Sequence, residues 1–128
     1  MSQIRVVTAQ IEDQGRYLIV QRPEKAVFPG LWEFPGGRVR QGETDEQALQ
    51  RCLFRRIGCS VVVGEQLLEK VHEYTEYAVC LVLYRVKINP SEAEPCSVKA
   101  MAWVGPSDFE SYEFPPADEA SARLLLDG

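Results

Sequence analysis

A helix with a clear start and a clear end is the feature that most constrains this chain. Thr44 and Gln47 have the spacing of a capping box, in which each residue satisfies a backbone N–H of the first turn. Asp45 and Glu46 add negative charge there, where the helix dipole favours it. Gly58 suits the left-handed residue that follows a helix. Between these signals, apolar residues recur every four positions and predict one buried stripe: Leu49, Leu53 and Ile57.

The other apolar runs are rich in β-branched residues and predict strands. They are Ile4–Ile11, Tyr17–Gln21, Val61–Val63, Tyr77–Val86 and Ala100–Val104. Asp13-Gln14-Gly15 supplies a turn, and Pro115-Pro116 lead into a last helix from about Ala117 to Leu126. No repeat, low-complexity tract or linker interrupts residues 1–128. We therefore expect a single α/β domain with a mixed sheet between helices, an α/β/α sandwich.

Residues 22–42 hold three prolines and four glycines, which predicts a structured loop with at most short strands. Loops of this length inside a compact domain are usually functional. We therefore look for a site in or beside this loop.

Composition excludes several kinds of protein. The net charge of −5 argues against a surface that binds nucleic acid through its backbone, although it permits a local basic pocket for a small anion. Four scattered cysteines and a single histidine, His72, do not make a zinc motif. No apolar run is long enough to cross a bilayer, and the N-terminus lacks the apolar stretch of a signal peptide. We expect a cytoplasmic protein whose thiols are reduced.

The segment from Gly37 to Cys59 resembles the Nudix box, G-x5-E-x7-R-E-U-x-E-E-x-G-U, where U is bulky and apolar. The matching positions are Gly37, Glu43, Arg51, Leu53 and Gly58. Residues 29–37 (PGLWEFPGG) and 114–119 (FPPADE) resemble the flanking segments of the MutT-like branch, the oxidised-nucleotide and CTP pyrophosphohydrolases. The likeness thus spans nearly the whole chain. It implies the Nudix fold and, as the family reaction, attack of water on a nucleoside triphosphate to give a monophosphate and pyrophosphate.

Three positions depart from that pattern. Cys52, Arg55 and Arg56 stand where the family has the glutamates that hold magnesium, and the spacing puts all three on one helix face. Three carboxylates carry a charge of −3, whereas one thiol and two guanidinium groups carry +2. Magnesium takes oxygen ligands, and arginine offers only donors. A further catalytic glutamate of the family aligns with Ser97. We expect no metal ligands in this box, and magnesium as cofactor only if the chain is active.

The resemblance also suggests which residues form the site. If the chain is active, Glu43 is the catalytic candidate. For substrate binding we single out Arg22, Phe34, Gly36, Gly37, Arg51, Arg55, Arg56 and Asp118. In the family the counterpart of Arg51 orients the loop, and the branch reads the base edge at the position of Asp118. Arg55 and Arg56 have two interpretations: they stabilise the helix dipole, or they replace the metal as a phosphate clamp.

We interpret the chain as a MutT-like domain that binds a nucleoside di- or triphosphate, or a nucleoside diphosphate-linked small molecule, with weak or lost magnesium-dependent hydrolysis. Two alternatives remain open at this point. One is an active pyrophosphohydrolase that uses other carboxylates: Asp45, Glu46, Glu65, Glu69 and Glu73. The other is a regulatory or protein-interaction pseudoenzyme. A membrane or nucleic-acid partner is not expected, and the sequence does not indicate an oligomeric state.

Overall fold

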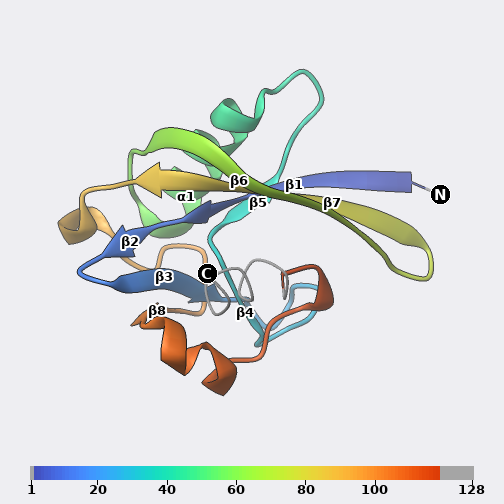
Figure 1. Cartoon of the computed structure of the whole chain (residues 1–128). Helices are drawn as coiled ribbons and strands as arrows, with labels where there is room; N and C mark the ends of the chain where they lie inside the picture. Colours follow the sequence, from blue (N-terminus) through green and yellow to red (C-terminus); the bar gives the residue numbers. More distant parts are fainter. Residues whose placement is uncertain (1, 119–128) are drawn as a thin grey trace.

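Two sheets of four strands each are present in residues 2–118, the part of the chain that this computed structural model describes. The first sheet has the order β5-β1-β7-β6; its four strands are labelled in Figure 1. Its strands are β1 (Ser2–Gln10), β5 (Gly36–Arg38), β6 (Val62–Glu73) and β7 (Tyr77–Lys87). β1 and β7 are parallel, and the other neighbours are antiparallel. The predicted α/β class with a mixed sheet is confirmed.

The second sheet is smaller and entirely antiparallel. It has the order β2-β3-β4, and β8 pairs with β3. Its strands are β2 (Glu12–Asp13), β3 (Arg16–Gln21), β4 (Trp32–Glu33) and β8 (Ala100–Val104). The turn between β2 and β3 puts Gln14 and Gly15 at positive φ, which the predicted turn chemistry suits. The loop of residues 22–42 carries the short strands β4 and β5, as the sequence predicts.

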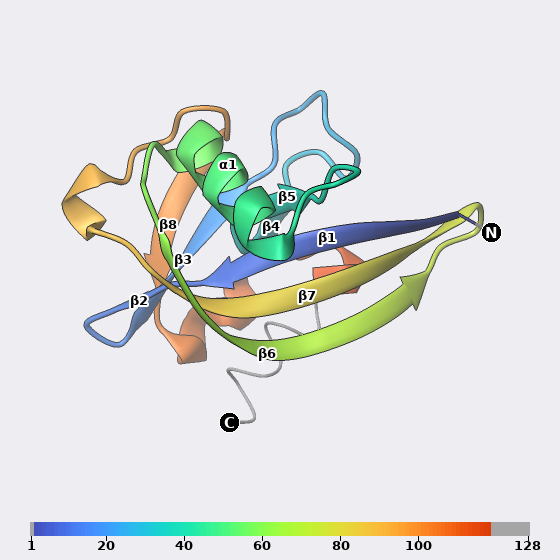
Figure 2. The same ribbon diagram turned by 90° about the horizontal axis from the view of Figure 1, so that it is seen from above.

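Helix α1 (Asp45–Ile57) begins and ends where the sequence predicts. Thr44 and Gln47 form both hydrogen bonds of the capping box, and Gly58 adopts the left-handed conformation with φ 74°. The stripe residues Leu49, Leu53 and Ile57 have no exposed surface. They pack with β1 and β7 in the main core, so α1 covers one face of the first sheet (Figure 2).

Alternate residues of β1 face opposite sides of this sheet. Val7 and Ala9 are buried in the core beneath α1. Ile4, Val6 and Thr8 line a cavity instead. The strand that supports the helix therefore also forms the floor of a site on the opposite face.

Strand β6 is much longer than the predicted Val61–Val63. It extends to Glu73 and pairs with β7 throughout, with register shifts between Val63 and Leu68. As the edge strand of the sheet it leaves most of its residues exposed, so its sequence is largely polar and lacks the apolar run of a buried strand. Its pairing with β7, rather than its own composition, makes it a strand.

Beyond β7 the chain makes two short 3-10 helices, η1 (Pro90–Glu92) and η2 (Pro106–Ser111), on either side of β8. Residues 116–118 are helical, which agrees with the start of the predicted last helix, and its remainder lies outside the described residues. Within residues 2–118, no helix has the length and apolarity needed to span a membrane.

Candidate functional site

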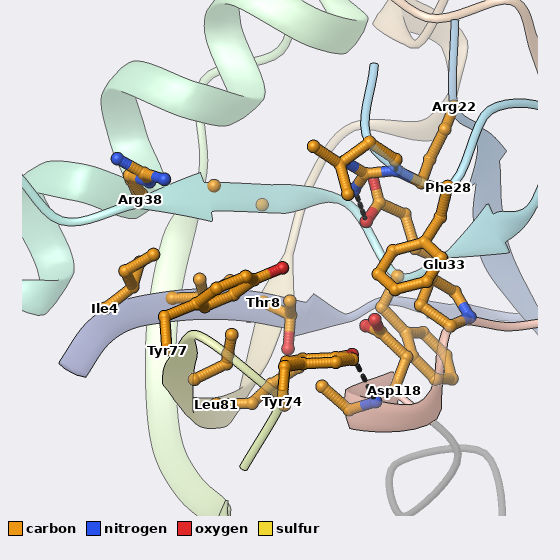
Figure 3. Close-up of a pocket in the computed structure, with 18 of the residues that line it drawn as sticks. Ile4, Thr8, Arg22, Phe28, Glu33, Arg38, Tyr74, Tyr77, Leu81 and Asp118 are labelled. Atoms are coloured by element: carbon orange, nitrogen blue, oxygen red, sulfur yellow. Dashed lines mark hydrogen bonds and ion pairs between the residues drawn. The ribbon is translucent and has the colours of Figure 1, made fainter. Parts of the chain in front are cut away.

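A cavity of about 580 Å³ lies on the face of the first sheet opposite α1 (Figure 3). Its volume is in the usual range of small-molecule sites. Its floor comes from β1 and β7: Ile4, Val6, Thr8, Val79 and Leu81. Phe28, in the loop after β3, lines another side together with Tyr74 and Tyr77, which flank the turn between β6 and β7. The cavity thus has an apolar floor and an aromatic wall, which suits a flat ring.

Two acidic side chains face one end of this cavity. Asp118 is only 6% exposed, and burial, together with the nearby Glu33, raises its pKa well above the usual range. Burial also raises the pKa of Glu33, although Arg22 opposes that shift with an ion pair of 2.7 Å from Nη1 to Oε1. Burial thus favours the protonated form of both carboxyl groups, and the ion pair with Arg22 opposes it at Glu33. Together they present polar groups at this end of an otherwise apolar cavity.

The aromatic residues divide into a core group and a cavity group. Phe34 has no exposed surface and packs against Phe109 and Phe114, with ring centroids 5.8 and 5.9 Å away. Its ring borders the cavity from within the core. Tyr74 and Tyr77 instead stack on each other at 5.1 Å, and the Tyr74 hydroxyl accepts a hydrogen bond from the backbone N–H of Ala117.

Sequence reasoning did not single out Phe28, Tyr74 or Tyr77. The available signal was the pair of tyrosines on either side of a short polar turn, because aromatic residues beside a turn are less easily buried than those within a strand. Trp32 makes an edge contact with Tyr112 at 5.1 Å and does not line the cavity.

Glu43 and Arg51 join the loop to the helix. Two nitrogens of Arg51 donate to the two carboxylate oxygens of Glu43 at 2.7 and 2.8 Å, and Arg51 also donates to the carbonyl of Arg38. Glu43 accepts a further bond from the backbone N–H of Arg40. The hydrogen bonds from Arg51, more than that from Arg40, lower the pKa of Glu43 to about 2. Both oxygens of Glu43 are therefore already engaged.

Two adjacent glycines allow the loop to approach the sheet and the helix. A Cβ on Gly36 would collide with the carbonyl oxygen of Val7. A Cβ on Gly37 would lie 2.7 Å from Sγ of Cys52 and 3.2 Å from Nη2 of Arg56. Strand β5 thus lies directly against the helix face that carries residues 52 and 56.

A second cavity, of about 270 Å³, lies on that helix face. It is lined by Arg51, Cys52, Arg55, Arg56 and Ser97. Arg56 lines the larger cavity as well, so the two cavities adjoin at its side chain. An apolar, aromatic cavity is therefore followed by a small cavity whose walls are mostly cationic.

The structure divides the predicted site residues between these cavities. Those lining the larger one are Arg22, Phe34, Gly36, Gly37, Arg56 and Asp118, and those lining the smaller one are Arg51, Arg55 and Arg56. Glu43 lines neither and reaches the site only through Arg51.

The carboxylates considered as alternative catalytic groups lie elsewhere. Asp45 is bound by Arg5 and by the hydroxyl of Tyr84, Glu65 pairs with Arg85, and Glu69 lies 3.9 Å from Arg5. Neither cavity is lined by any of these three, nor by Glu46 or Glu73.

Residues 6–123 match the NUDIX domain family. The chain belongs to that family. It is similar to a CTP pyrophosphohydrolase of Escherichia coli (strain K12), with 34% identity over 92% of this chain and 87% of the relative. An 8-oxo-dGTP diphosphatase of Haemophilus influenzae is also 34% identical, over 96% of this chain and 91% of its own. The solution structure of the E. coli ORF135 protein superposes with a TM-score of 0.83 and 30% identity, covering 99% of this chain and 91% of that one.

Nudix hydrolases generally use a divalent metal such as magnesium, which requires a set of oxygen ligands. In residues 2–118 no three His, Cys, Asp or Glu side chains lie close enough together to hold a metal ion. A buried thiol and two guanidinium groups at positions 52, 55 and 56 do not fit a hard cation that requires oxygen ligands.

Proposed function

We propose that this Nudix domain binds a nucleoside di- or triphosphate, with the nucleoside in the larger cavity and the phosphates in the smaller one. We further propose that its magnesium-dependent pyrophosphohydrolase activity is weak or lost. The observation that carries the proposal is the junction of the two cavities at Arg56, because it joins a site for a flat ring to a site for anions.

The nucleoside part of the proposal rests on the walls of the larger cavity. A base that stacks there meets Phe28 or Tyr77, since the ring of Phe34 is enclosed in the core. Its polar edge meets Glu33 and Asp118. Relatives named for CTP and for 8-oxo-dGTP support a nucleotide as the ligand and make these two the first compounds to test.

The loss of hydrolysis follows from charge. A metal ion that bridges phosphates stabilises the negative charge that develops in the transition state, by several kcal/mol. Cys52, Arg55 and Arg56 cannot hold magnesium there, and Glu43 is bound to Arg51 on both oxygens. The arginines stabilise phosphate charge in the bound substrate as well as in the transition state, which favours binding more than catalysis.

An active enzyme with relocated carboxylates has less support, because the five candidates line neither cavity. The carboxyl groups in the larger cavity, Glu33, Glu76 and Asp118, do not form a group of three that would hold a metal. No contact in residues 2–118 favours the regulatory interpretation over ligand binding.

The test compares this chain with the E. coli CTP pyrophosphohydrolase in one assay. We expect CTP or 8-oxo-dGTP to bind in calorimetry, and pyrophosphate release with magnesium to be slower by about three orders of magnitude or more, since about 1.4 kcal/mol corresponds to a factor of ten. Turnover comparable to the relative's, and unchanged by Glu43→Gln after repurification, would contradict the loss of activity. Absence of nucleotide binding at millimolar concentration would contradict the proposal as a whole.

A further inference from the structure

Two of the three arginines that line the smaller cavity, Arg55 and Arg56, have no ion pair in the part of the chain described. Arg22 is paired with Glu33, and Arg51 with Glu43. Within residues 2–118, no carboxylate lies within ion-pair distance of Arg55 or Arg56, and neither guanidinium donates a hydrogen bond. Arg51 is thus compensated by Glu43, whereas Arg55 and Arg56 have no bonded counterion within residues 2–118, although the charge of Arg56 acts on Glu33 and opposes the rise of its pKa.

The end of α1 does not need these side chains. Backbone N–H groups of the following chain already donate to its last carbonyls: Gly58 to Phe54, Glu94 to Ile57, and Cys96 and Ser97 to Arg56. Arg55 and Arg56 favour this end of the helix through its dipole, which does not require their N–H groups to form hydrogen bonds. Because other donors hold these positions, the guanidinium N–H groups of Arg55 and Arg56 are available to a ligand.

From this arrangement we infer that the smaller cavity binds a polyphosphate directly and free of metal, so that magnesium weakens binding instead of assisting it. The inference rests on the proposed function and adds that the ligand binds as the magnesium-free anion. Arg55 and Arg56 contribute two positive charges and planar donor groups that match phosphate oxygens. The phosphates of a nucleotide whose base occupies the larger cavity extend along Arg56 into the smaller cavity.

The effect of magnesium follows from competition for the same oxygens. Magnesium binds phosphate oxygens and cancels two of their charges, which weakens the attraction to the arginines and occupies oxygens that would accept from them. It also brings a second cation close to guanidinium groups, with no carboxylate on this helix face in the described residues to hold it. Metal and protein therefore oppose each other's binding to the ligand, and by linkage the effect is reciprocal.

The test is calorimetric titration of the full chain with sodium pyrophosphate, in EDTA and again with magnesium in excess. We expect binding in EDTA, and an apparent affinity lowered about tenfold or more by magnesium. The double change Arg55→Gln and Arg56→Gln should lower the affinity in EDTA by about tenfold or more as well. Arg16→Gln is the matched control, because Arg16 is an exposed arginine in the β2–β3 hairpin and lines neither cavity.

Tighter binding of pyrophosphate with magnesium than without it would overturn the inference. The inference would also be overturned if the variant with Arg55→Gln and Arg56→Gln bound pyrophosphate with the same affinity as the Arg16→Gln control. The proposed function is tested separately, by titration of the same chain with CTP or 8-oxo-dGTP in EDTA and again with magnesium in excess. A nucleotide that binds only with magnesium leaves nucleotide binding intact while contradicting the metal-free form. If neither nucleotide nor pyrophosphate binds under either condition, both fail.

Discussion

The two ends of α1 use their charged residues differently. At the start of the helix, Asp45 accepts hydrogen bonds at 2.8 and 2.7 Å from Arg5 and one at 2.6 Å from the hydroxyl of Tyr84. At its end, Arg55 and Arg56 have no ion pair within residues 2–118 and line a cavity. Both ends carry the charge that the helix dipole favours. Only the contacts distinguish a charge that holds the fold together from one that is available to a ligand.

The cause lies in what each end faces. The first turn lies against β1 and β7, which contribute Arg5 and Tyr84, and the side chain of Asp45 is only 17% exposed. The last turn lies against the loop of residues 94–97, which offers backbone N–H groups to the carbonyls and no partner to the guanidinium groups. The first end should therefore control stability, and the second end ligand binding.

Asp45→Ala tests the first half of this comparison and should have the largest effect on stability. It leaves Arg5 with only the 3.9 Å contact to Glu69, and it removes three hydrogen bonds, two of them within an ion pair. We expect the free energy of unfolding to fall by about 3 kcal/mol, measured by urea denaturation.

Glu46→Ala is the matched control. Glu46 lies in the same first turn, so it interacts equally with the dipole, but it is exposed and makes only a 3.5 Å contact with Gln50. We expect a loss of about 0.5 kcal/mol or less. Equal losses for the two variants would mean that the network around Asp45 does not hold the helix in place.

The second half of the comparison is tested by replacing the charges at the far end. The triple change Cys52→Glu, Arg55→Glu and Arg56→Glu places three carboxylates on one helix face. We expect magnesium affinity to increase about tenfold or more, roughly 1.4 kcal/mol, measured by calorimetry against the unchanged chain. Hydrolysis is expected to remain slow, because Ser97 still stands where the family has a further glutamate. A folded triple variant without a gain in magnesium binding would show that these positions do not converge.

The sequence predicted those parts of the fold that local contacts determine. Thr44, Gln47 and Gly58 specify the ends of α1 through bonds to their own neighbours, and the stripe at Leu49, Leu53 and Ile57 specifies its buried face. The length of β6 was missed for the opposite reason. An edge strand exposed on most of its length has a polar composition, and only its pairing with β7 makes it a strand.

The site was predictable where a motif places residues on one element, and less so where several elements meet. Cys52, Arg55 and Arg56 share a helix face, as their spacing predicts. The approach of Asp118 to Glu33 joins residues far apart in the chain, and Tyr74 and Tyr77 reach the cavity on a hairpin whose first strand was not predicted in full. Phe34 and Phe28 both line the cavity, yet Phe34 is fully buried in the core whereas Phe28 is partly exposed, a difference that only packing creates.

Acid should lower the stability contributed by the start of α1 and leave that of its end unchanged. This effect should be smaller than the loss expected for Asp45→Ala. Arg51 lowers the pKa of Glu43 from 4.5 to about 2, and Arg5 lowers that of Asp45. When folding lowers the pKa of a carboxyl group, that group stabilises the fold fully at any pH above its pKa in the unfolded chain. The contribution is lost as the pH falls through the lower pKa of the folded state. We therefore expect the urea midpoint of the unchanged chain to decrease between about pH 4.5 and pH 2, and to decrease less in Glu43→Gln. Arg55→Gln should leave that slope unchanged, because Arg55 forms no ion pair with Glu43 or Asp45. An equal slope in Glu43→Gln and the unchanged chain would mean that the Glu43–Arg51 pair does not couple folding to pH.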